Sequence, residues 1–121
     1  MSNDPRHILG RHGEQLAAEH LERLGFEVVA RNHRTRYGEI DLIAADATTL
    51  VIVEVKTRRG SGSPWDNLDH RKQTQVRRMG RAYLSEVRDR PRRGHVRFDA
   101  IGVRFDQRGR FACLDHLVSA F

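Results

Sequence analysis

Two apolar segments rich in β-branched residues, separated by a short polar loop, restrict the folds open to this chain more than any other feature. The segments span residues 38–45 and 50–57, and residues 46–49 lie between them. Apolar runs of this length are typical of strands, and the four-residue loop has the length of a hairpin connection. The pattern therefore predicts an antiparallel hairpin in which Ala45 pairs with Leu50.

The predicted register gathers four charged residues on one face of the hairpin. Successive side chains alternate between the two faces of a strand, so Asp41 lies opposite Glu54 and Glu39 lies opposite Lys56. The other face carries only apolar side chains, namely Ile40, Leu42, Ala44, Val51, Val53 and Val55. One face is therefore predicted to pack into a core. The other presents a candidate site, to which Glu39 is an accessory candidate.

The opposed carboxylates of Asp41 and Glu54 need a positive partner. Directly opposed residues in an antiparallel pair have Cβ atoms about 5 Å apart, a distance at which two carboxylates repel each other. A hard divalent cation suits them, because Mg²⁺ is commonly held by one or two carboxylates together with water and phosphate. Lys56, on the same face, would then hold a phosphate or a nucleophilic water. The alternative is a charge ladder on a half-exposed sheet, neutralised by Lys56 and nearby arginines.

Three motifs extend this pattern along the chain. They are Gly10-x-x-Gly13-Glu14, Asn32-x-Arg34-x-x-x-Gly38-Glu39-Ile40-Asp41-Leu42-Ile43 and Val53-Glu54-Val55-Lys56-Thr57-Arg58. An Asp, a hairpin and then Glu-x-Lys resemble the PD-(D/E)xK nuclease superfamily. The three motifs together resemble the uncharacterised bacterial YraN family, which is similar to Holliday-junction resolvases. The resemblance runs from about Gly10 to Val103, and Ile40 stands where the superfamily's motif has proline.

The resemblance implies both a fold and a type of site. The fold is α/β, a restriction-endonuclease-like three-layer α/β/α arrangement with a central mixed sheet, helices on both faces and the core order αβββαβ. Asp41 and Glu54 would bind Mg²⁺ or Mn²⁺, aided by the Val55 carbonyl and, through water, by Glu14. Lys56 would orient the attacking water. The implied activity is cleavage of phosphodiester bonds in DNA to leave a 5′-phosphate, with branched or recombination intermediates among the substrates.

Glu14 falls on the apolar stripe of the first predicted helix, which covers residues 10–24. Ala17 and Ala18 follow it at helical spacing, so its side chain is expected to face inward. An acid in the first turn also interacts favourably with the helix dipole, which is a purely structural reason for its presence. The resemblance places an acid of the first helix at the site, so we expect Glu14 to point toward the hairpin carboxylates.

The positive charge of the chain is concentrated in one part of it. The net charge is +6, and residues 56–97 hold 13 Lys or Arg against four acids, which gives +9 there and −3 elsewhere. Arginines outnumber lysines 20 to 2, which favours forked contacts to phosphate. A basic half beside an acidic pocket is typical of a protein that grips a polyanion next to a metal. A solvated surface would explain the basic residues alone.

Candidate contacts to nucleic acid lie on both sides of the hairpin and on the helix that follows it. They are Arg34 and Arg36 before the hairpin, Arg58 and Arg59 in the Gly- and Ser-rich segment after it, and Lys72 and Gln75 on the polar face of the second predicted helix. Tyr37, next to Arg36, is a candidate for stacking on a base, although a tyrosine packed at an edge is more common. The expected partner is DNA rather than RNA, and cutting both strands would favour a homodimer.

Length and composition limit the class of protein. A chain of 121 residues is one domain, predicted here as residues 9–121 after a disordered leader at residues 1–8. No apolar run is long enough to span a bilayer, and the first residues lack the apolar region of a signal peptide, so no membrane partner and a cytoplasmic location are expected. A single cysteine excludes an internal disulfide and a multi-cysteine zinc site.

The remaining elements follow from periodicity and breakers. A first strand is predicted at residues 26–31, followed by a basic turn that leads into the hairpin. The second helix is predicted from Asp66 or Asn67 to about Val87, and a further strand from His95 to Phe105. Asp99 in that strand is expected to be a buried structural acid. The tail, residues 111–121, is expected to form a short strand and a last helical turn.

The residues leave three classes of function open. The first is the metal-dependent nuclease described above, and all of its expected positions are occupied. The second is a nucleic-acid-binding module that retains the site with little or no catalysis. The third is a protein-interaction subunit in which the fold is vestigial. Binding to duplex DNA at two salt concentrations separates the third class from the others, and a metal-dependent cleavage assay separates the first two.

Overall fold

A computed structural model describes residues 4–66 and 68–121 of the chain as two helices and five strands. In chain order these are α1 (Pro5–Arg23), β1 (Glu27–Thr35), β2 (Gly38–Ala45), β3 (Thr49–Arg59), α2 (His70–Glu86), β4 (His95–Phe105) and β5 (Phe111–Leu117). Within the described residues, no helix has the length and apolar character needed to cross a membrane.

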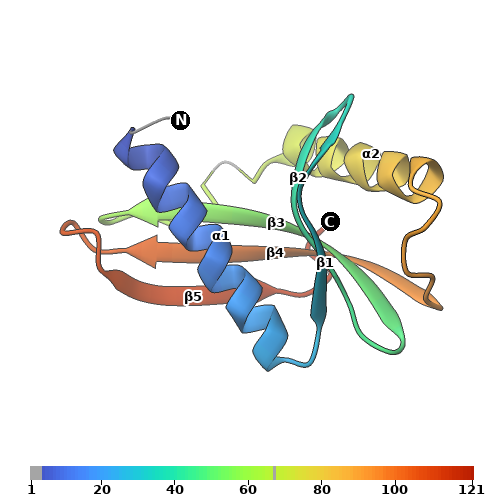
Figure 1. The fold of residues 1–121 in the computed structure, drawn as a ribbon. Coiled ribbons are helices and arrows are strands. Elements are labelled where there is room, and N and C mark those ends of the chain that lie inside the picture. Colours follow the sequence, from blue (N-terminus) through green and yellow to red (C-terminus); the bar gives the residue numbers. More distant parts are fainter. Residues whose placement is uncertain (1–3, 67) are drawn as a thin grey trace.

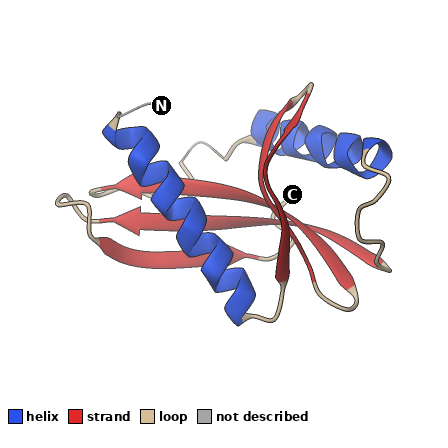
Figure 2. Cartoon of the chain, in the orientation of Figure 1, coloured by secondary structure: helices blue, strands red, loops and turns tan. Residues whose placement is uncertain are grey.

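The strands form one mixed sheet in the order β1-β2-β3-β4-β5 (Figure 1). β3 and β4 run parallel, because α2 connects them as a crossover, and the other three neighbouring pairs are antiparallel. The β1–β2 ribbon rises steeply away from the other three strands and reaches toward α2 (Figure 2). This strong twist separates the start of β2 from the end of β3, and the candidate site lies at that separation.

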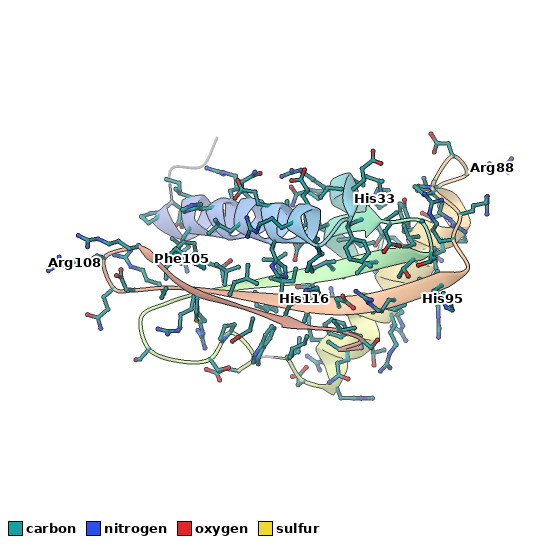
Figure 3. The ribbon with its side chains drawn as sticks, turned by 90° about the horizontal axis from the view of Figure 1, so that it is seen from below. His33, Arg88, His95, Phe105, Arg108 and His116 are labelled. Carbon is teal, nitrogen blue, oxygen red and sulfur yellow. The ribbon has the colours of Figure 1, made fainter. Side chains whose placement is uncertain are left out.

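The helices cover opposite faces of the sheet, with α1 on one side and α2 on the other (Figure 3). The α1 face buries Ala17, Ala18 and Leu21 of the helix against a cluster that includes Leu42, Val53 and Phe105. The α2 face buries Val76, Met79 and Tyr83 against a second cluster that includes Ile40, Ile43 and Ile52. This three-layer α/β/α architecture is the predicted one, and it is consistent with a restriction-endonuclease-like fold.

The predicted hairpin register is confirmed over its first four pairs, which run from Ala45–Leu50 to Leu42–Val53. Beyond Leu42, β2 continues to pair with β1 but no longer with β3. The predicted pairings of Asp41 with Glu54 and of Glu39 with Lys56 are therefore wrong as strand register: the ladder stops before Asp41, and Glu39 lies opposite Arg34 of β1. The strict alternation of faces also ends here. Ile40, expected beside Leu42, packs in the α2-side cluster instead.

Helix α1 begins at Pro5 rather than near Gly10, so it includes residues 5–8 of the segment that was expected to be a leader. Asp4 caps it, because its side chain accepts a hydrogen bond from the Arg6 amide, and Pro5 occupies the first turn. An acidic N-cap followed by proline is a favourable helix start. Residues 1–3 of the predicted leader lie outside the described residues.

Other boundaries differ more modestly from the expected ones. β1 extends to Thr35, so the residues expected to form a basic turn are mostly strand. α2 begins at His70 with Asp69 as its cap, several residues after the expected start at Asp66 or Asn67, and Asn67 lies outside the described residues. β4 has the predicted bounds. The tail contains β5 and a turn, with no last helical turn.

Candidate active site

Asp41 lies at the point where β2 separates from β3. The backbone ladder between these strands stops at Leu42 and Val53. The amide of Val55, farther along β3, therefore has no backbone partner on β2. Asp41 supplies that partner, because its Oδ2 accepts a hydrogen bond of 2.7 Å from the Val55 amide. Buried backbone amides are nearly always paired. The strand separation and the orientation of this carboxylate are therefore parts of one local structure.

Glu54 occupies the neighbouring position on β3 and is almost fully buried, with 6% of its surface exposed. Its Oε1 lies 3.5 Å from the Nζ of Lys56 on the same strand and 3.1 Å from the Nζ of Lys72 on α2. Both lysine side chains are about one-quarter exposed. A buried carboxylate is costly unless cations compensate it, and two ammonium groups do so here.

The closeness of the two carboxylates changes the acidity of Asp41. Burial is the largest effect and the negative charge of Glu54 is the second, and together they raise the pKa of Asp41 to about 8. The hydrogen bond from Val55 and the charge of Lys72 act in the opposite direction but are outweighed. A carboxyl group that resists ionisation next to another acid is typical of a site that is completed by a cation or a proton.

The two lysines on Glu54 are the only lysines in the chain, which has 20 arginines. Arginine prefers forked, planar contacts, whereas a lysine ammonium is a compact point charge on a flexible stem. Both lysines therefore occur where a small, mobile positive charge meets a buried carboxylate. Lys72 was expected to contact nucleic acid, and the structure places it against Glu54 instead.

Glu14 lies on α1 beside the hairpin, close enough for its charge to contribute to the raised pKa of Asp41. Its Oε1 accepts a hydrogen bond of 3.1 Å from the Asn32 side chain. A hollow of about 340 Å³ lies next to it and is also lined by Glu39. Gly13 allows α1 to lie close to β3, because a Cβ at that position would overlap the side chain of Thr57.

The described residues contain no group of three or more His, Cys, Asp or Glu side chains placed to hold a metal ion. Asp41 and Glu54 are nevertheless two adjacent hard oxygen ligands that repel each other when both are ionised. Mg²⁺ needs no more than one or two protein carboxylates, because water and substrate phosphate complete its octahedron. The donor set fits Mg²⁺ or Mn²⁺, and it does not fit a metal that requires a closed cage of protein ligands.

The other predicted contacts to nucleic acid lie in different places and have partners within the chain. Arg34 pairs with Glu39 at 3.6 Å, and both side chains are well exposed. Arg58 pairs with Asp66 at 3.0 Å, while Arg59 donates to the Gln107 carbonyl. The first contact joins β1 to β2, and the other two attach neighbouring loops to the end of β3.

Two of the predicted contacts, Gln75 and Arg36, lie together between the β1–β2 turn and α2. Gln75 donates to the Tyr37 carbonyl at 2.9 Å. The Arg36 guanidinium lies 5.0 Å from the centroid of the Tyr37 ring. Three arginines of α2 that the sequence analysis did not select, Arg71, Arg78 and Arg81, line the hollows beside them. They are spaced by seven and three residues along the helix, about two turns and one turn, which was a usable indication that they share a face.

Asp99 belongs to a separate network on the α1 side of the sheet. It is fully buried and accepts hydrogen bonds from Arg97, His116 and the Ser119 amide. His116 in turn contacts His20 of α1 at 3.0 Å. Burial alone would raise the pKa of Asp99, but these hydrogen bonds outweigh it and the pKa lies below its usual value. The network joins α1, β4 and β5, which is the structural role expected for this acid.

Comparison with known proteins assigns the chain to a family. Residues 13–103 match the model of the uncharacterised protein family UPF0102. A UPF0102 protein of Nocardia farcinica is 45% identical over 96% of this chain and 91% of its own length. One from Pelotomaculum thermopropionicum is 40% identical over 98% of each chain. The chain belongs to family UPF0102.

This assignment confirms the resemblance to the YraN family. A UPF0102 protein of Herpetosiphon aurantiacus is also similar, with 46% identity over 83% of this chain and 84% of its own length. The UPF0102 match spans the segment from Gly13 to Val103. It therefore includes Asp41, Glu54 and the two lysines, and it ends before β5.

Proposed function

We propose that this UPF0102 protein is a metal-dependent nuclease that cleaves phosphodiester bonds in DNA. The observation that carries the proposal is the geometry at the strand separation. Two adjacent carboxylates, Asp41 and Glu54, come from neighbouring strands, and both lysines of the chain contact one of them. Hard oxygen ligands beside a mobile cation are what phosphodiester hydrolysis requires, because negative charge develops on the phosphate during the reaction.

Each residue then has a distinct role. Asp41 and Glu54 would hold Mg²⁺ or Mn²⁺ together with the Val55 carbonyl, and Glu14 would act through a water molecule. When bound, the ion would supply Lewis acidity and activate a water for attack. Lys56, one-quarter exposed, orients the attacking water and faces the scissile phosphate. Lys72 holds the Glu54 carboxylate in position, because its Nζ lies 3.1 Å from Oε1, closer than the Nζ of Lys56 at 3.5 Å.

The resemblance to Holliday-junction resolvases points to the class of substrate. Branched DNA and recombination intermediates in the cytoplasm are the proposed substrates, DNA is preferred over RNA, and the product carries a 5′-phosphate. Symmetrical cutting of two strands would require a second copy of the chain. The excess of arginine in residues 56–97, which include α2, supplies the positive charge that binding of such a polyanion needs.

The test is cleavage of a panel of junction, flap, single-stranded and duplex DNAs with Mn²⁺ or with EDTA. Wild-type protein is expected to cut at least one member only when Mn²⁺ is present. Asp41→Asn should abolish the cutting, and calorimetry should show weaker Mn²⁺ binding by this variant. Equal Mn²⁺ binding by the wild type and Asp41→Asn would remove the basis for the metal site.

A DNA-binding protein without catalysis is the second candidate, and one observation favours it. Glu54 is already compensated by Lys56 and Lys72, so the charges are balanced without a metal. This candidate predicts tight DNA binding that is indifferent to Mn²⁺. Cleavage of no member of the panel, together with salt-sensitive binding, would favour it over the nuclease.

A further inference from the structure

Two adjoining hollows lie between the β1–β2 turn and α2, outside the carboxylate site. One has a volume of about 400 Å³ and the other about 470 Å³, and both are lined by Tyr37 and Arg78. The first is also lined by Arg36 and Arg81, and the second by Arg71. Together they form one trough that follows α2, and we call it the α2 trough.

The α2 trough is strongly positive. It has four arginines, Arg36, Arg71, Arg78 and Arg81, and Glu86 at one end is the only acid among its lining residues. Within the part of the chain that the structure describes, none of these arginines forms an ion pair with a carboxylate within 4.0 Å. This distinguishes them from Arg34 and Arg58, which do. Their charge is available to an anionic ligand.

Tyr37 lines both hollows of the trough, and its backbone is held in place. Its carbonyl accepts a hydrogen bond from the Gln75 side chain, and its amide donates to Thr35 Oγ1 at 3.1 Å. The neighbouring Gly38 packs so tightly on α2 that a Cβ there would lie 2.9 Å from Met79 Sδ. Tyr37 is 37% exposed, although its backbone is held on both sides. A residue whose backbone is already held loses little backbone entropy when it contacts a ligand.

We propose that the α2 trough binds an unpaired segment of a DNA strand, with a base stacked on Tyr37 and phosphates on Arg71, Arg78 and Arg81. Single-strand sites combine a positive groove along the backbone with aromatic rings on which bases stack. A paired base inside a duplex has no free face to offer such a ring. The proposal therefore concerns the non-duplex part of the substrate.

The trough and the carboxylate site meet at neighbouring residues of α2. Arg71 lines it, and the adjacent residue Lys72 contacts Glu54. An unpaired strand in the trough would thus lie next to the proposed cleavage site. The inference rests on the proposed function for this placement and refines its substrate to DNA in which single-stranded and duplex segments meet. The binding itself does not require the metal.

The experiment measures fluorescence anisotropy of labelled DNA in EDTA, so that no cleavage occurs. The ligands are an oligo-dT of about 12 nucleotides, within the range that one single-strand site covers, and a blunt duplex of the same length. Tyr37→Leu should weaken binding of the oligo-dT by at least about fivefold, the effect of losing one stacked base, and leave duplex binding within about twofold. Tyr37→Phe keeps the ring and should bind the oligo-dT as the wild type does.

Arg78→Gln should flatten the dependence of oligo-dT affinity on salt, by about 0.7 in the log–log slope for one lost phosphate contact. The matched control is Arg108→Gln, which removes the same charge from the turn between β4 and β5. Arg108 and Arg88, the latter just after α2, lie at opposite ends of the molecule (Figure 3). The control should leave oligo-dT binding unchanged.

Equal loss of oligo-dT and duplex binding in Tyr37→Leu, or no loss of either, would overturn the proposal. So would an equal effect of Arg108→Gln and Arg78→Gln on the salt slope. These results are independent of catalysis, because they are obtained in EDTA. Failure of the wild type to cleave DNA in Mn²⁺ would count against the nuclease alone.

Discussion

Replacing Asp41 by Asn should make the metal-free protein more stable, although it removes a residue of the proposed active site. Burial and the neighbouring Glu54 raise the pKa of Asp41 to about 8 in the folded chain, against a usual value of 3.8. At pH 7 the unfolded chain ionises this carboxyl freely and the folded chain does not. By linkage, one pKa unit corresponds to about 1.4 kcal/mol, so the penalty at neutral pH is on the order of 4 kcal/mol.

The pH dependence of this effect has a definite sign. The folded pKa lies above the unfolded one, so the stability associated with protonated Asp41 is complete below its usual pKa and is lost as pH rises toward about 8. Asn cannot ionise, and its side-chain oxygen can still accept the hydrogen bond from Val55. The advantage of Asp41→Asn should therefore grow by up to about 1.4 kcal/mol for each pH unit between about 4 and 8.

The assay is urea unfolding of wild-type protein and Asp41→Asn in EDTA at several pH values from about 5 to about 8. Allowing for the cost of burying an amide, Asp41→Asn should raise the free energy of unfolding by roughly 2–4 kcal/mol near pH 8. Each kcal/mol corresponds to an increase of about 3–4 °C in Tm. Mn²⁺ should reverse the order, because it stabilises only a protein that binds it. The matched control is Glu39→Gln, an exposed acid paired with Arg34, which should change stability by less than about 1 kcal/mol.

A lower stability of Asp41→Asn near pH 8 would refute this reasoning. So would a stability difference that does not change with pH. Either result would mean that the carboxylate of Asp41 is adequately compensated without a metal. The charge-ladder interpretation would then be preferred.

Two further predictions concern the packing of α1 and the buried acid Asp99. Gly13→Ala should lower the free energy of unfolding by about 1–3 kcal/mol, because it forces a Cβ against Thr57. Gly10→Ala in the same helix meets no neighbouring atom within 4 Å and should raise the free energy of unfolding by about 0.5–1 kcal/mol. Equal melting temperatures of the two variants would contradict this. Asp99→Asn should cost roughly 3 kcal/mol, because it leaves Arg97 without its buried partner. Chemical denaturation measures it, and a change below about 1 kcal/mol would show that Asp99 is not structural.

The hairpin was predictable because its information is local. Strand alternation and loop length fix the register from Ala45–Leu50 to Leu42–Val53, and both are visible in a short stretch of sequence. The pairing failed beyond Leu42, because β2 separates from β3 there and keeps only β1 as a neighbour. Alternation says which face a side chain occupies, but it does not say where a strand loses one of its two neighbours.

The start of α1 shows a missed indication rather than missing information. Asp4 and Pro5 are a favourable N-cap and first helical residue, and they directly precede a segment with helical spacing. Polar composition was given more weight than capping chemistry. A cap followed by proline is the better guide to where a helix begins.

The contact between Lys72 and Glu54 could not be found from spacing. The two residues are joined by a long connection with little periodicity, and their approach depends on how α2 packs across the sheet after the crossover. The same is true of the α2 trough, which forms only because the β1–β2 ribbon bends toward the helix. Local sequence predicted the chemical groups, whereas tertiary packing decides which of them meet.

The most direct test of the central claim is the single-turnover cleavage rate of Lys56→Ala, compared with the wild type, on the best-bound DNA in Mn²⁺. In the proposed mechanism Lys56 acts at the reacting phosphate, while binding of the DNA is shared among many arginines. The account predicts a loss of on the order of a hundredfold or more in rate, with affinity within a few-fold and Tm close to that of the wild type. Cleavage that survives Lys56→Ala, or wild-type protein that cuts no DNA in Mn²⁺, would contradict it.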